Sequence, residues 1–265
     1  MRGLLIVNPR SGARSRRAHA LAAQARARGI EARLVRPGED PAALAASAEA
    51  DAVGVAGGDG SLAPVAAVAL SRGLPFVCVP TGTRNHFARD LGLDRDDPLA
   101  ALAAFESGRE VRIDVGRANG RLFLNNVSFG LYARLVHRRE AHRRRGEALA
   151  RLRALWLSLR ERGPVGLVVD GEPVAARFAL VANNAYQLDL FDLGERERLD
   201  EGALHAYFAA GSLPNAWEER VAPSFRVEAS GRLRAAVDGE PVELVSPVEL
   251  RVEPLALRVL LPEEE

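Results

Sequence analysis

The stretch Ala56-Gly57-Gly58-Asp59-Gly60-Ser61 lies between an apolar run and an alanine-rich segment, and it decides how the first part of the chain folds. The apolar run at 51–56 has the composition of a short buried strand, and residues 62–70 have helical composition and spacing. A strand that breaks into glycines and continues as a helix presents backbone N–H groups at the positive end of the helix dipole. Glycine also lets the backbone approach a ligand where a Cβ would collide. The stretch therefore predicts an anion site, with a glycine-rich turn and an aspartate cap on the next helix as the alternative.

Asp59 is unexpected in a site for an anion, because its carboxylate would repel a phosphate. The residue fits if a divalent cation lies between the carboxylate and the phosphates, since Mg²⁺ takes oxygen ligands and bridges phosphate oxygens in phosphoryl transfer. The stretch thus indicates a metal–phosphate site more specifically than a site for a bare anion.

The composition limits the chemistry that the chain can perform. Its 265 residues can bury a sizeable core in one large domain or two modest ones, and the net charge of +1 gives no global field that would attract nucleic acid. Every basic residue is arginine, which excludes a phosphate-binding lysine of the P-loop type and Schiff-base chemistry. Cys78 is the single cysteine and lies in an apolar run, so we expect a small buried hydrophobe and no disulfide within the chain.

The start of the chain and its apolar runs indicate a cytosolic protein. An apolar run at 3–7 is expected to be a strand, no signal peptide precedes it, and no apolar run is long enough to span a bilayer. We therefore expect a cytoplasmic protein that is at most peripheral at the inner face of a membrane.

The first part of the chain alternates expected strands and helices. Such alternation predicts a parallel sheet flanked by helices, with binding loops at the carboxyl ends of the strands. Loops rich in turn residues follow three of the strands, at 8–12, 57–61 and 80–85, and we expect them to converge on one crevice. The strands are expected at 4–7, 31–35, 52–56 and 76–79, and the helices at 14–28, 41–48, 62–70, 84–91 and 98–106.

Beyond about residue 110 the pattern changes to short strands separated by turn signals, which suggests a sandwich or barrel. We expect one helix in this part, at about 133–160, with leucines at helical spacing and many arginines. A solvated face explains the arginines, and contact with an anionic membrane is the alternative. The strands are expected at 111–116, 122–129, 165–170, 175–182, 203–209, 224–228, 233–237, 242–252 and 255–261.

The hexapeptide Val-Asp-Gly-Glu-Pro-Val occurs twice, at 169–174 and at 237–242. Asp-Gly between two apolar runs is a strong signal for a two-residue hairpin turn, so both copies are expected to be tight turns. Nothing in the local sequence separates Glu172 from Glu240. Any chemistry assigned to one turn must therefore explain why the other lacks it.

An ordered set of motifs runs along most of the chain: Val7-Asn8-Pro9-Arg10-Ser11-Gly12, Gly57-Gly58-Asp59-Gly60-Ser61, Pro80-Thr81-Gly82-Thr83-Arg84-Asn85, Arg112-Ile113-Asp114-Val115-Gly116, Leu124-Asn125-Asn126, Leu199-Asp200-Glu201-Gly202 and Val237-Asp238-Gly239-Glu240. In this order the motifs resemble the diacylglycerol kinase catalytic family, which includes bacterial lipid kinases and has sphingosine kinases as relatives. The resemblance implies a Rossmann-like α/β nucleotide-binding domain, of the NAD kinase and diacylglycerol kinase type, at 1–116. A β-sandwich domain with the one basic helix would follow at 117–265. Little chain follows Pro262, so we expect little of it to run back to the first domain.

The resemblance also assigns roles to residues of these motifs. It implies that ATP is the phosphoryl donor and that Asp59 and Asp114 place Mg²⁺ on its phosphates, directly or through water. Glu201 stands where relatives carry an aspartate of a structural metal site. Glu240 is implied as the general base that takes the proton of a lipid hydroxyl, with Asp238 as its close partner. The residues implied to hold ATP are Asn8, Pro9, Arg10, Ser11, Gly12, Gly57, Gly58, Asp59, Gly60, Ser61, Thr83 and Asn85.

By resemblance, then, the protein is expected to be a lipid kinase that transfers the γ-phosphoryl group of Mg-ATP to a hydroxyl of a diacylglycerol-like or sphingoid-type lipid. Its partner is a lipid at the membrane surface rather than nucleic acid, and a homodimer is compatible with this function. Two other classes stay open, namely a soluble kinase similar to NAD kinases and a non-catalytic nucleotide or lipid sensor. His86, where relatives carry an aspartate, and Arg36, where a threonine is usual, favour the sensor.

Overall fold

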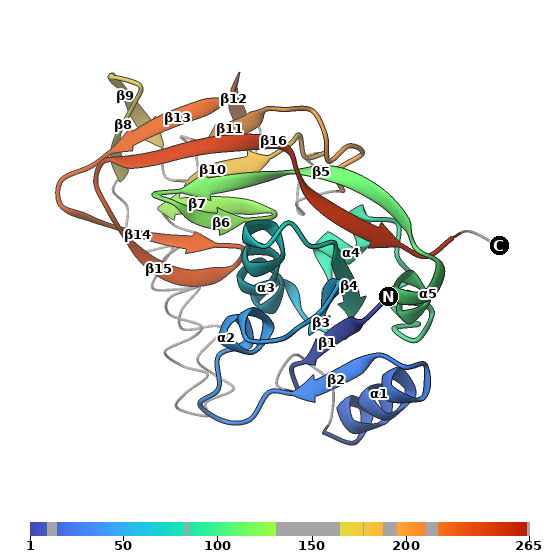
Figure 1. Cartoon of the computed structure of the whole chain (residues 1–265). Helices are drawn as coiled ribbons and strands as arrows, with labels where there is room; N and C mark the ends of the chain where they lie inside the picture. The colour runs from blue at the N-terminus through green and yellow to red at the C-terminus, as the bar shows by residue number, and fades with distance from the viewer. Residues whose placement is uncertain are drawn as a thin grey trace. The chain divides into compact units, whose positions relative to one another are not determined.

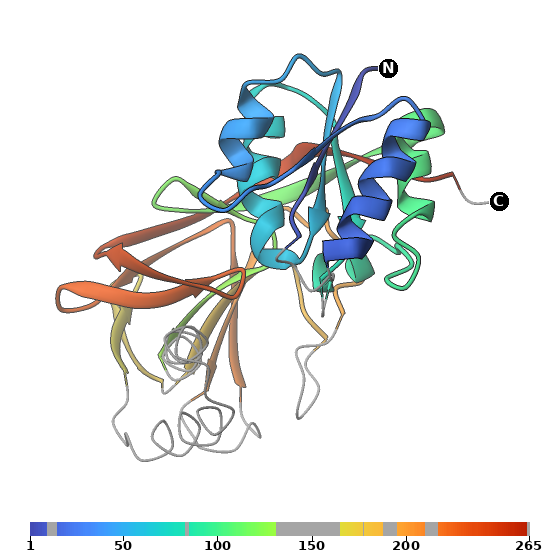
Figure 2. The same cartoon turned by 90° about the horizontal axis from the view of Figure 1, so that it is seen from below.

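The computed structural model describes residues 1–9, 15–82, 85–130, 165–176, 178–187, 195–209 and 217–263. The chain forms two compact units, of which the first contains Met1–Val115 and Pro254–Glu265 and the second contains Gly116–Glu253. Figure 1 and Figure 2 show the strands and helices of each unit in two views. The basic helix expected at about 133–160 lies outside the described residues. Within the described residues, no helix is both long and apolar enough to cross a membrane.

A parallel sheet forms the centre of the first unit. Its strands follow the order β2-β1-β3-β4-β16, and β1 pairs in parallel with both β2 and β3, while β3 pairs in parallel with β4. Strands buried on both faces are expected to be almost wholly apolar, and every residue of β1, β3 and β4 is buried. The bounds are β1 Gly3–Val7, β2 Glu31–Leu34, β3 Ala52–Gly57, β4 Phe76–Pro80 and β16 Val248–Leu261.

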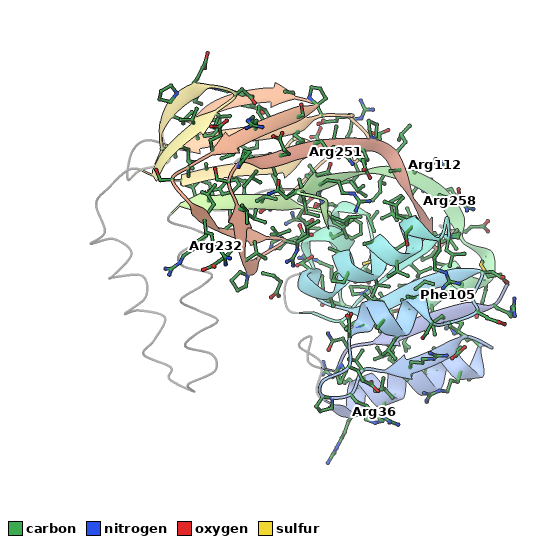
Figure 3. All side chains as sticks on the ribbon, turned by 60° about the vertical axis from the view of Figure 1, so that its left-hand side comes forward. Arg36, Phe105, Arg112, Arg232, Arg251 and Arg258 are labelled. Carbon is green, nitrogen blue, oxygen red and sulfur yellow. The ribbon has the colours of Figure 1, made fainter. Side chains whose placement is uncertain are left out.

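Helices cover both faces of this parallel sheet, with α2 and α3 on one face and α1 and α5 on the other (Figure 2). Side chains alternate between the faces of a strand, so Leu5 and Val7 of β1 pack in one cluster with apolar residues of α1 and with Phe105 of α5, which Figure 3 labels. Asp40 begins α2 by accepting the N–H of Ala42 at 3.0 Å. The bounds are α1 Ser15–Ala27, α2 Pro41–Ala46, α3 Asp59–Ser71, α4 His86–Asp90, η1 Ala100–Ala103 and α5 Ala104–Ser107.

The end of β16 corrects the predicted domain boundary, which placed all of 117–265 in the second domain and returned little chain to the first. The last part of β16 pairs in parallel with β4, with Val259 opposite Phe76, so residues 254–265 belong to the first unit. Leu257 and Val259 are completely buried there. The physical reason is that this segment covers the edge that β4 would otherwise expose.

Two antiparallel sheets form the sandwich of the second unit. One has the strand order β12-β11-β10-β7-β14-β15, and the other joins β13 to β8, β8 to β9 and β13 to the first part of β16, with β6 paired to the end of β5. The bounds are β5 Arg109–Ala118, β6 Arg121–Phe123, β7 Asn126–Gly130, β8 Val165–Val169, β9 Glu172–Ala176, β10 Phe178–Asn183, β11 Leu204–Ala209, β12 Trp217–Ala222, β13 Ser224–Glu228, β14 Arg232–Val237 and β15 Glu240–Val245.

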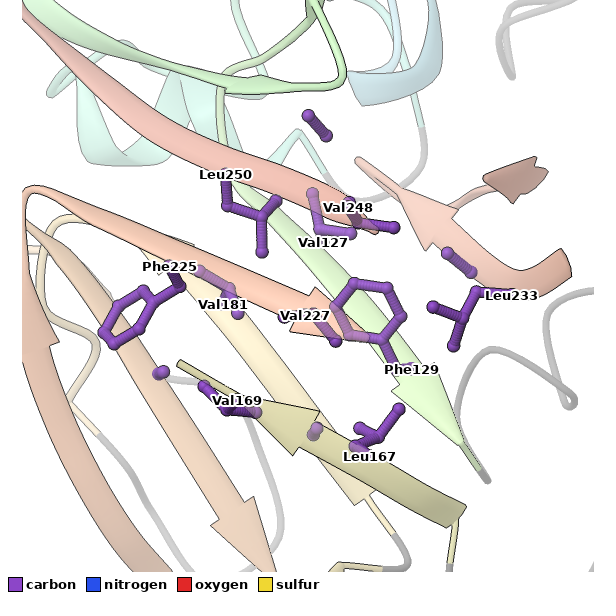
Figure 4. Close-up of a cluster of buried hydrophobic side chains, with 14 of the residues drawn as sticks. Val127, Phe129, Leu167, Val169, Val181, Phe225, Val227, Leu233, Val248 and Leu250 are labelled. Carbon is purple, nitrogen blue, oxygen red and sulfur yellow. The ribbon is translucent and has the colours of Figure 1, made fainter. Parts of the chain in front are cut away.

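One hydrophobic cluster holds the two sheets of the sandwich together. Figure 4 shows Phe129 and Val181 from one sheet packed with Leu167, Phe225 and Leu250 from the other. Inward-facing side chains that alternate with polar outward-facing ones are the pattern of an aligned sandwich. The α/β fold followed by a β-sandwich, which the sequence predicts, is therefore confirmed.

The strands differ from the expected ones in two respects. The expected strands at 122–129, 175–182 and 242–252 are each divided, the first because the backbone turns at 124–125 between β6 and β7. Strand β12 was not expected, because it lies at the edge of its sheet and carries Glu218, Glu219 and Arg220 without an apolar alternation.

Candidate functional site

Three loops leave the same edge of the parallel sheet in the first unit. Val7 lies opposite Ala56 and Gly57 lies opposite Pro80, so the carboxyl ends of β1, β3 and β4 are neighbours. Asn8, which follows β1 together with the half-buried Pro9, donates its N–H to the carbonyl of Ala56 at 2.9 Å. Among the residues predicted to hold ATP, Arg10, Ser11, Gly12 and Thr83 lie outside the described residues. The described parts of the three loops lie side by side, as a parallel sheet requires.

The second and third loops touch through two glycines. A Cβ on Gly82 would lie 2.5 Å from the Cα of Gly58, so this approach requires glycine at 82. Asn85 holds the third loop from within: its side-chain oxygen accepts the N–H of Gly82 at 2.8 Å, and its side-chain nitrogen donates to the Gly82 carbonyl at 3.0 Å. Asn85 is 5% exposed and has a left-handed φ of 51°, which asparagine tolerates. Asn85 thus shapes the loop, and its contact with ATP stays a prediction.

Asp59 links the glycine loop to the third loop. Its carboxylate accepts the N–H groups of His86 at 3.3 Å and Phe87 at 3.1 Å, and it therefore caps the first turn of α4. This differs from the cap on its own helix that the sequence offered as an alternative. In the described residues no side chain caps α3, which begins after Gly58, so the N-terminal N–H groups of α3 keep the arrangement of an anion site.

Ser61 lies in the first turn of α3. Its N–H and its hydroxyl both donate to the carbonyl of Gly58, at 2.9 and 2.8 Å. The Ser61 side chain therefore stabilises the connection from Gly58 into α3. Gly57, Gly58 and Gly60 have no side chains that would cover their backbone.

Cys78 of β4 is a buried free thiol, as the sequence predicts. Burial, and next to it the negative charge of Asp59, raises the pKa of the Cys78 thiol far above its usual range. A thiol that stays protonated is a poor nucleophile and a poor metal ligand, so Cys78 is part of the core.

The three residues predicted to bind metal have different surroundings. Asp59 is half-buried beside the glycine loop, and a carboxylate oxygen that accepts one N–H keeps a further lone pair, so its position fits a cation held next to phosphates. Asp114 is completely buried and accepts the N–H of Leu255 at 2.8 Å, where β16 bends with a φ of 50°. Asp114 therefore fixes the bend of β16, and its part in metal binding stays a prediction.

Glu201 fits a metal poorly. Its Oε2 accepts the N–H of Ala185 at 2.9 Å and lies 3.0 Å from Nε2 of His205, whose Nδ1 lies 2.8 Å from Oε1 of Glu219. Across the described part of the chain, no group of three or more His, Cys, Asp or Glu side chains could hold a metal ion. The described partners of the Glu201 carboxylate are thus a backbone N–H and an imidazole, and metal binding by Glu201 stays a prediction.

Both copies of the repeated hexapeptide form two-residue hairpin turns. Val169 pairs with Glu172 and Val237 pairs with Glu240, and the Asp-Gly pairs between them have positive φ angles of 51° and 84° in the first turn and 48° and 77° in the second. These are the angles that a type I′ turn requires, so the sequence-based prediction of tight turns is confirmed. Glu240, the predicted base, is an exposed residue at the start of β15.

The predicted partner of the base, Asp238, is buried and binds the backbone between β6 and β7. Its Oδ1 accepts the N–H groups of Asn125 at 2.8 Å and Asn126 at 3.1 Å, and its Oδ2 accepts that of Leu124 at 2.9 Å. Three backbone donors satisfy a carboxylate that is only 8% exposed. The turn that carries Glu240 is thereby attached to the neighbouring strand.

Arg196 is a residue of this region that the sequence does not reveal. It stands in the charged run Glu195-Arg196-Glu197-Arg198, which is typical of an exposed segment, yet it is 2% exposed. Its guanidinium donates to the carbonyls of Leu124 and Asn183 and to Oδ1 of Asn125. Only the fold could show that one arginine of this run turns inward.

The fold and these loops define a class of protein, namely an α/β unit with glycine loops at the carboxyl edge of a parallel sheet, joined to a β-sandwich. Residues 2–118 match the model of the family described as the diacylglycerol kinase catalytic domain. Over this segment the chain is similar to that family, in agreement with the resemblance of its motifs.

Curated relatives carry names that agree with this family. A protein of Bacillus subtilis named diacylglycerol kinase is 36% identical over 95 residues, which cover 35% of this chain and 31% of that protein. A protein of Pseudomonas aeruginosa named probable lipid kinase YegS-like is 42% identical over 82 residues, or 30% of this chain and 26% of that protein. The chain thus matches about a third or less of the length of these relatives.

Solved structures resemble the whole fold. A crystal structure of a diacylglycerol kinase from Bacillus anthracis superposes with a TM-score of 0.71 and 20% sequence identity, and the match covers 98% of this chain and 96% of that chain. At this identity the likeness concerns the fold alone. The similarity of fold includes the β-sandwich as well as the α/β unit.

Proposed function

We propose that the protein is an ATP-dependent lipid kinase that transfers the γ-phosphoryl group of Mg-ATP to a hydroxyl of a diacylglycerol-like or sphingoid-type lipid. The observation that carries this proposal is the match of residues 2–118 to the diacylglycerol kinase catalytic domain. The names of the curated relatives support a lipid as acceptor. The fold, shared with a solved diacylglycerol kinase, is consistent with the same assignment for the rest of the chain.

The arrangement of the loops supports ATP as the donor. Phosphoryl transfer has a loose transition state, so catalysis rests on positioning and on neutralisation of charge. The N-terminus of α3 and the glycines at 57, 58 and 60 offer backbone N–H groups to phosphate oxygens. The chain has no lysine, so arginine side chains and backbone N–H groups have to supply the positive partners on the protein.

Asp59 is the proposed protein ligand, direct or through water, of a Mg²⁺ ion on the phosphates. When bound, this ion would neutralise negative charge on the transferred group. The hydrogen bonds of Asp59 with His86 and Phe87 hold its carboxylate at the start of α4. Asp114 is proposed as a second ligand of this ion, direct or through water, from a buried position in which it also holds the β16 backbone.

Glu240 is the proposed general base that accepts the proton of the lipid hydroxyl. A base has to meet the hydroxyl within hydrogen-bond distance, so its backbone must be held firmly. The rigid Asp238-Gly239 turn, which three hydrogen bonds to the Asp238 carboxylate attach to residues 124–126, meets this requirement. Its exposed side chain is also accessible to a lipid acceptor.

The test is transfer of radiolabel from γ-labelled Mg-ATP to a panel of acceptors presented in mixed micelles: diacylglycerol, monoacylglycerol, sphingosine, ceramide and a bacterial lipid extract, with NAD as a soluble acceptor. The matched variants are Asp59→Asn and, as the control, Asp51→Asn. Asp51 is an exposed aspartate just before β3, and it accepts the N–H of Arg2. We expect labelled lipid, a loss of about 100-fold in Asp59→Asn and no loss in Asp51→Asn.

Other outcomes of this test would replace the proposal. Label on NAD alone would indicate a soluble kinase. Binding of ATP without transfer to any acceptor would indicate a nucleotide sensor. Transfer to lipid that is equal in wild type and Asp59→Asn would keep the kinase activity and remove the role of Asp59.

A further inference from the structure

A buried cation, Arg196, and a buried anion, Asp238, bind the same short segment, residues 124–126. Asp238 accepts the N–H groups of Leu124, Asn125 and Asn126, while Arg196 binds acceptors of that segment. Nη1 of Arg196 lies 2.7 Å from the carbonyl oxygen of Leu124, and Nη2 lies 2.7 Å from Oδ1 of Asn125. The short segment 124–126 is therefore fixed through both its donors and its acceptors.

Arg196 also joins this segment to β10. Its Nη1 donates to the carbonyl of Asn183 at 3.0 Å, and Asn183 in turn donates from its side chain to the carbonyl of Leu124 at 3.2 Å. The backbone N–H of Asn183 donates to the carbonyl of Asn125 at 2.9 Å. The planar fork of a guanidinium can serve acceptors in several directions at once, which a lysine ammonium cannot do in the same geometry.

An aromatic side chain closes the region around Arg196. The guanidinium carbon lies 5.6 Å from the centre of the Tyr186 ring, within the range of a cation–π contact. Oη of Tyr186 accepts a hydrogen bond from Nδ2 of Asn126 at 3.1 Å. The backbone N–H of Tyr186 donates to Oη of Tyr207 at 3.1 Å. Arg196 and Asp238 are thus members of one buried polar network.

We propose that Arg196 is a positioning residue for the Asp238-Gly239-Glu240 turn, acting through the Leu124–Asn126 segment. This inference rests on the proposed function, because the base whose position it fixes is Glu240. Arg196 does not touch the reacting atoms. It holds residues 124–126 in the one arrangement in which their N–H groups meet at the Asp238 carboxylate, and the turn follows that carboxylate.

Loss of Arg196 should displace the Asp238-Gly239-Glu240 turn without unfolding the protein. The acceptors of Leu124 and Asn125 would lose a charged donor inside the protein, so the segment would move or admit water. A shift of about 1 Å in a positioned group lowers a rate by up to about 100-fold. Binding of ATP should not change, because the loops predicted to hold it belong to the first unit, whereas Arg196 and residues 124–126 belong to the second.

The test compares Arg196→Met with Arg198→Met. Arg198 stands two positions away, is 63% exposed in its side chain and pairs with Asp200 at 2.9 Å, so it matches the change in residue type without the burial. Three quantities are measured in full-length protein: kcat with the best lipid acceptor, KM for Mg-ATP, and hydrogen exchange of the backbone at 122–128. Circular dichroism and thermal unfolding establish that each variant is folded.

We expect Arg196→Met to lower kcat by about 10- to 100-fold at an unchanged KM for Mg-ATP, and to speed exchange at 122–128 but not at the first hairpin, 166–174. Arg198→Met should match wild type in all three quantities. A folded Arg196→Met with wild-type kcat, or with wild-type exchange at 122–128, would overturn the inference. A rise in KM for Mg-ATP equal to the loss in kcat/KM would also overturn it, because the effect would then lie in nucleotide binding.

Arg196→Lys covers the case in which Arg196→Met does not fold. It keeps the charge and the apolar stem but cannot reach the acceptors of Leu124 and Asn125 together, so its kcat should be lower than that of wild type and of Arg198→Met. Wild-type kcat in this variant would overturn the inference. If wild type labels no lipid, the proposed function fails, and exchange at 122–128 decides the inference alone: faster exchange in the variant supports it, and unchanged exchange overturns it.

Discussion

The two copies of Val-Asp-Gly-Glu-Pro-Val fold alike and are used differently. Both are two-residue turns with nearly equal backbone angles. Asp170 in the first turn is exposed and accepts one N–H, that of Arg226, at 2.8 Å. Asp238 in the second turn is buried and accepts three.

The glutamates of the two turns also differ in their surroundings. Glu172 is 71% exposed in its side chain and pairs with Arg220, which lies 3.0 Å away. Glu240 follows an aspartate that is attached to the β6–β7 connection and, through it, to the network of Arg196. The difference arises from the neighbouring strands, β13 beside the first turn and β7 beside the second. An identical hexapeptide therefore determines the turn, and the neighbouring backbone determines what the turn can do.

Replacing the aspartate should separate the two turns most strongly. Asp238→Ala leaves two buried N–H groups and one half-buried N–H group without their acceptor and should lower the free energy of unfolding by about 3 kcal/mol. Asp170→Ala removes one exposed hydrogen bond and should lower it by about 1 kcal/mol or less. Urea denaturation of both variants beside wild type measures the difference. Equal losses would mean that burial of Asp238 does not distinguish the turns.

Replacing the glycine should lower the free energy of unfolding equally at the two turns. Gly171 and Gly239 have φ angles of 84° and 77°, and an added Cβ would meet nothing within 4 Å at either position. Gly171→Ala and Gly239→Ala should therefore each lower the free energy of unfolding by about 1 kcal/mol, through backbone strain alone. The same denaturation experiment serves as the check. A loss at one turn that exceeds the other by more than about 1 kcal/mol would show that the backbones of the turns are not equivalent.

Loss of an ion pair away from both turns should lower the free energy of unfolding least, and it gives a reference for the aspartate and glycine replacements. Arg258, labelled in Figure 3, binds Glu110 through two hydrogen bonds of 2.8 and 2.6 Å, and this contact lowers the pKa of the Glu110 carboxyl. Because both side chains are 34% exposed, Glu110→Gln should cost only about 0.5 kcal/mol.

The pH dependence of that small loss has a definite sign. A pKa that is lower in the folded than in the unfolded state adds stability above the ordinary glutamate pKa of about 4.3. The contribution disappears as the pH falls through the lowered pKa, so wild type and Glu110→Gln should converge in acid. Unfolding measured between neutral and acid pH would contradict this if the difference grew on acidification.

Much of the fold could be predicted from local patterns. The central strands β1, β3 and β4 are apolar runs, and the loops after β1 and β3 carry Asn8-Pro9 and Gly57-Gly58, which mark the carboxyl edge of a parallel sheet. The two Asp-Gly turns were also predictable, because their φ angles are a local property. Strand β12 lacked an apolar alternation, and the return of β16 to the first unit depends on pairing with β4, which lies far away in sequence.

The sequence could not predict the contacts that the candidate site residues make. The motifs named Asp59, Asp238 and Glu201, yet no local signal indicated that Asp59 caps α4 or that His205 binds Glu201. Arg196 could not be found at all, because a charged run predicts exposure and only tertiary contacts turn one member inward. The contacts that distinguish the two turns are of this long-range kind.

The most direct test of the account is lipid phosphorylation by Glu240→Gln and Glu172→Gln beside wild type, with labelled Mg-ATP and the acceptor that wild type prefers. The account predicts that kcat falls by about 100- to 10,000-fold in Glu240→Gln, because a general base is lost, and that Glu172→Gln retains the wild-type kcat. Loss in Glu172→Gln alone, or wild-type activity in Glu240→Gln, would contradict it.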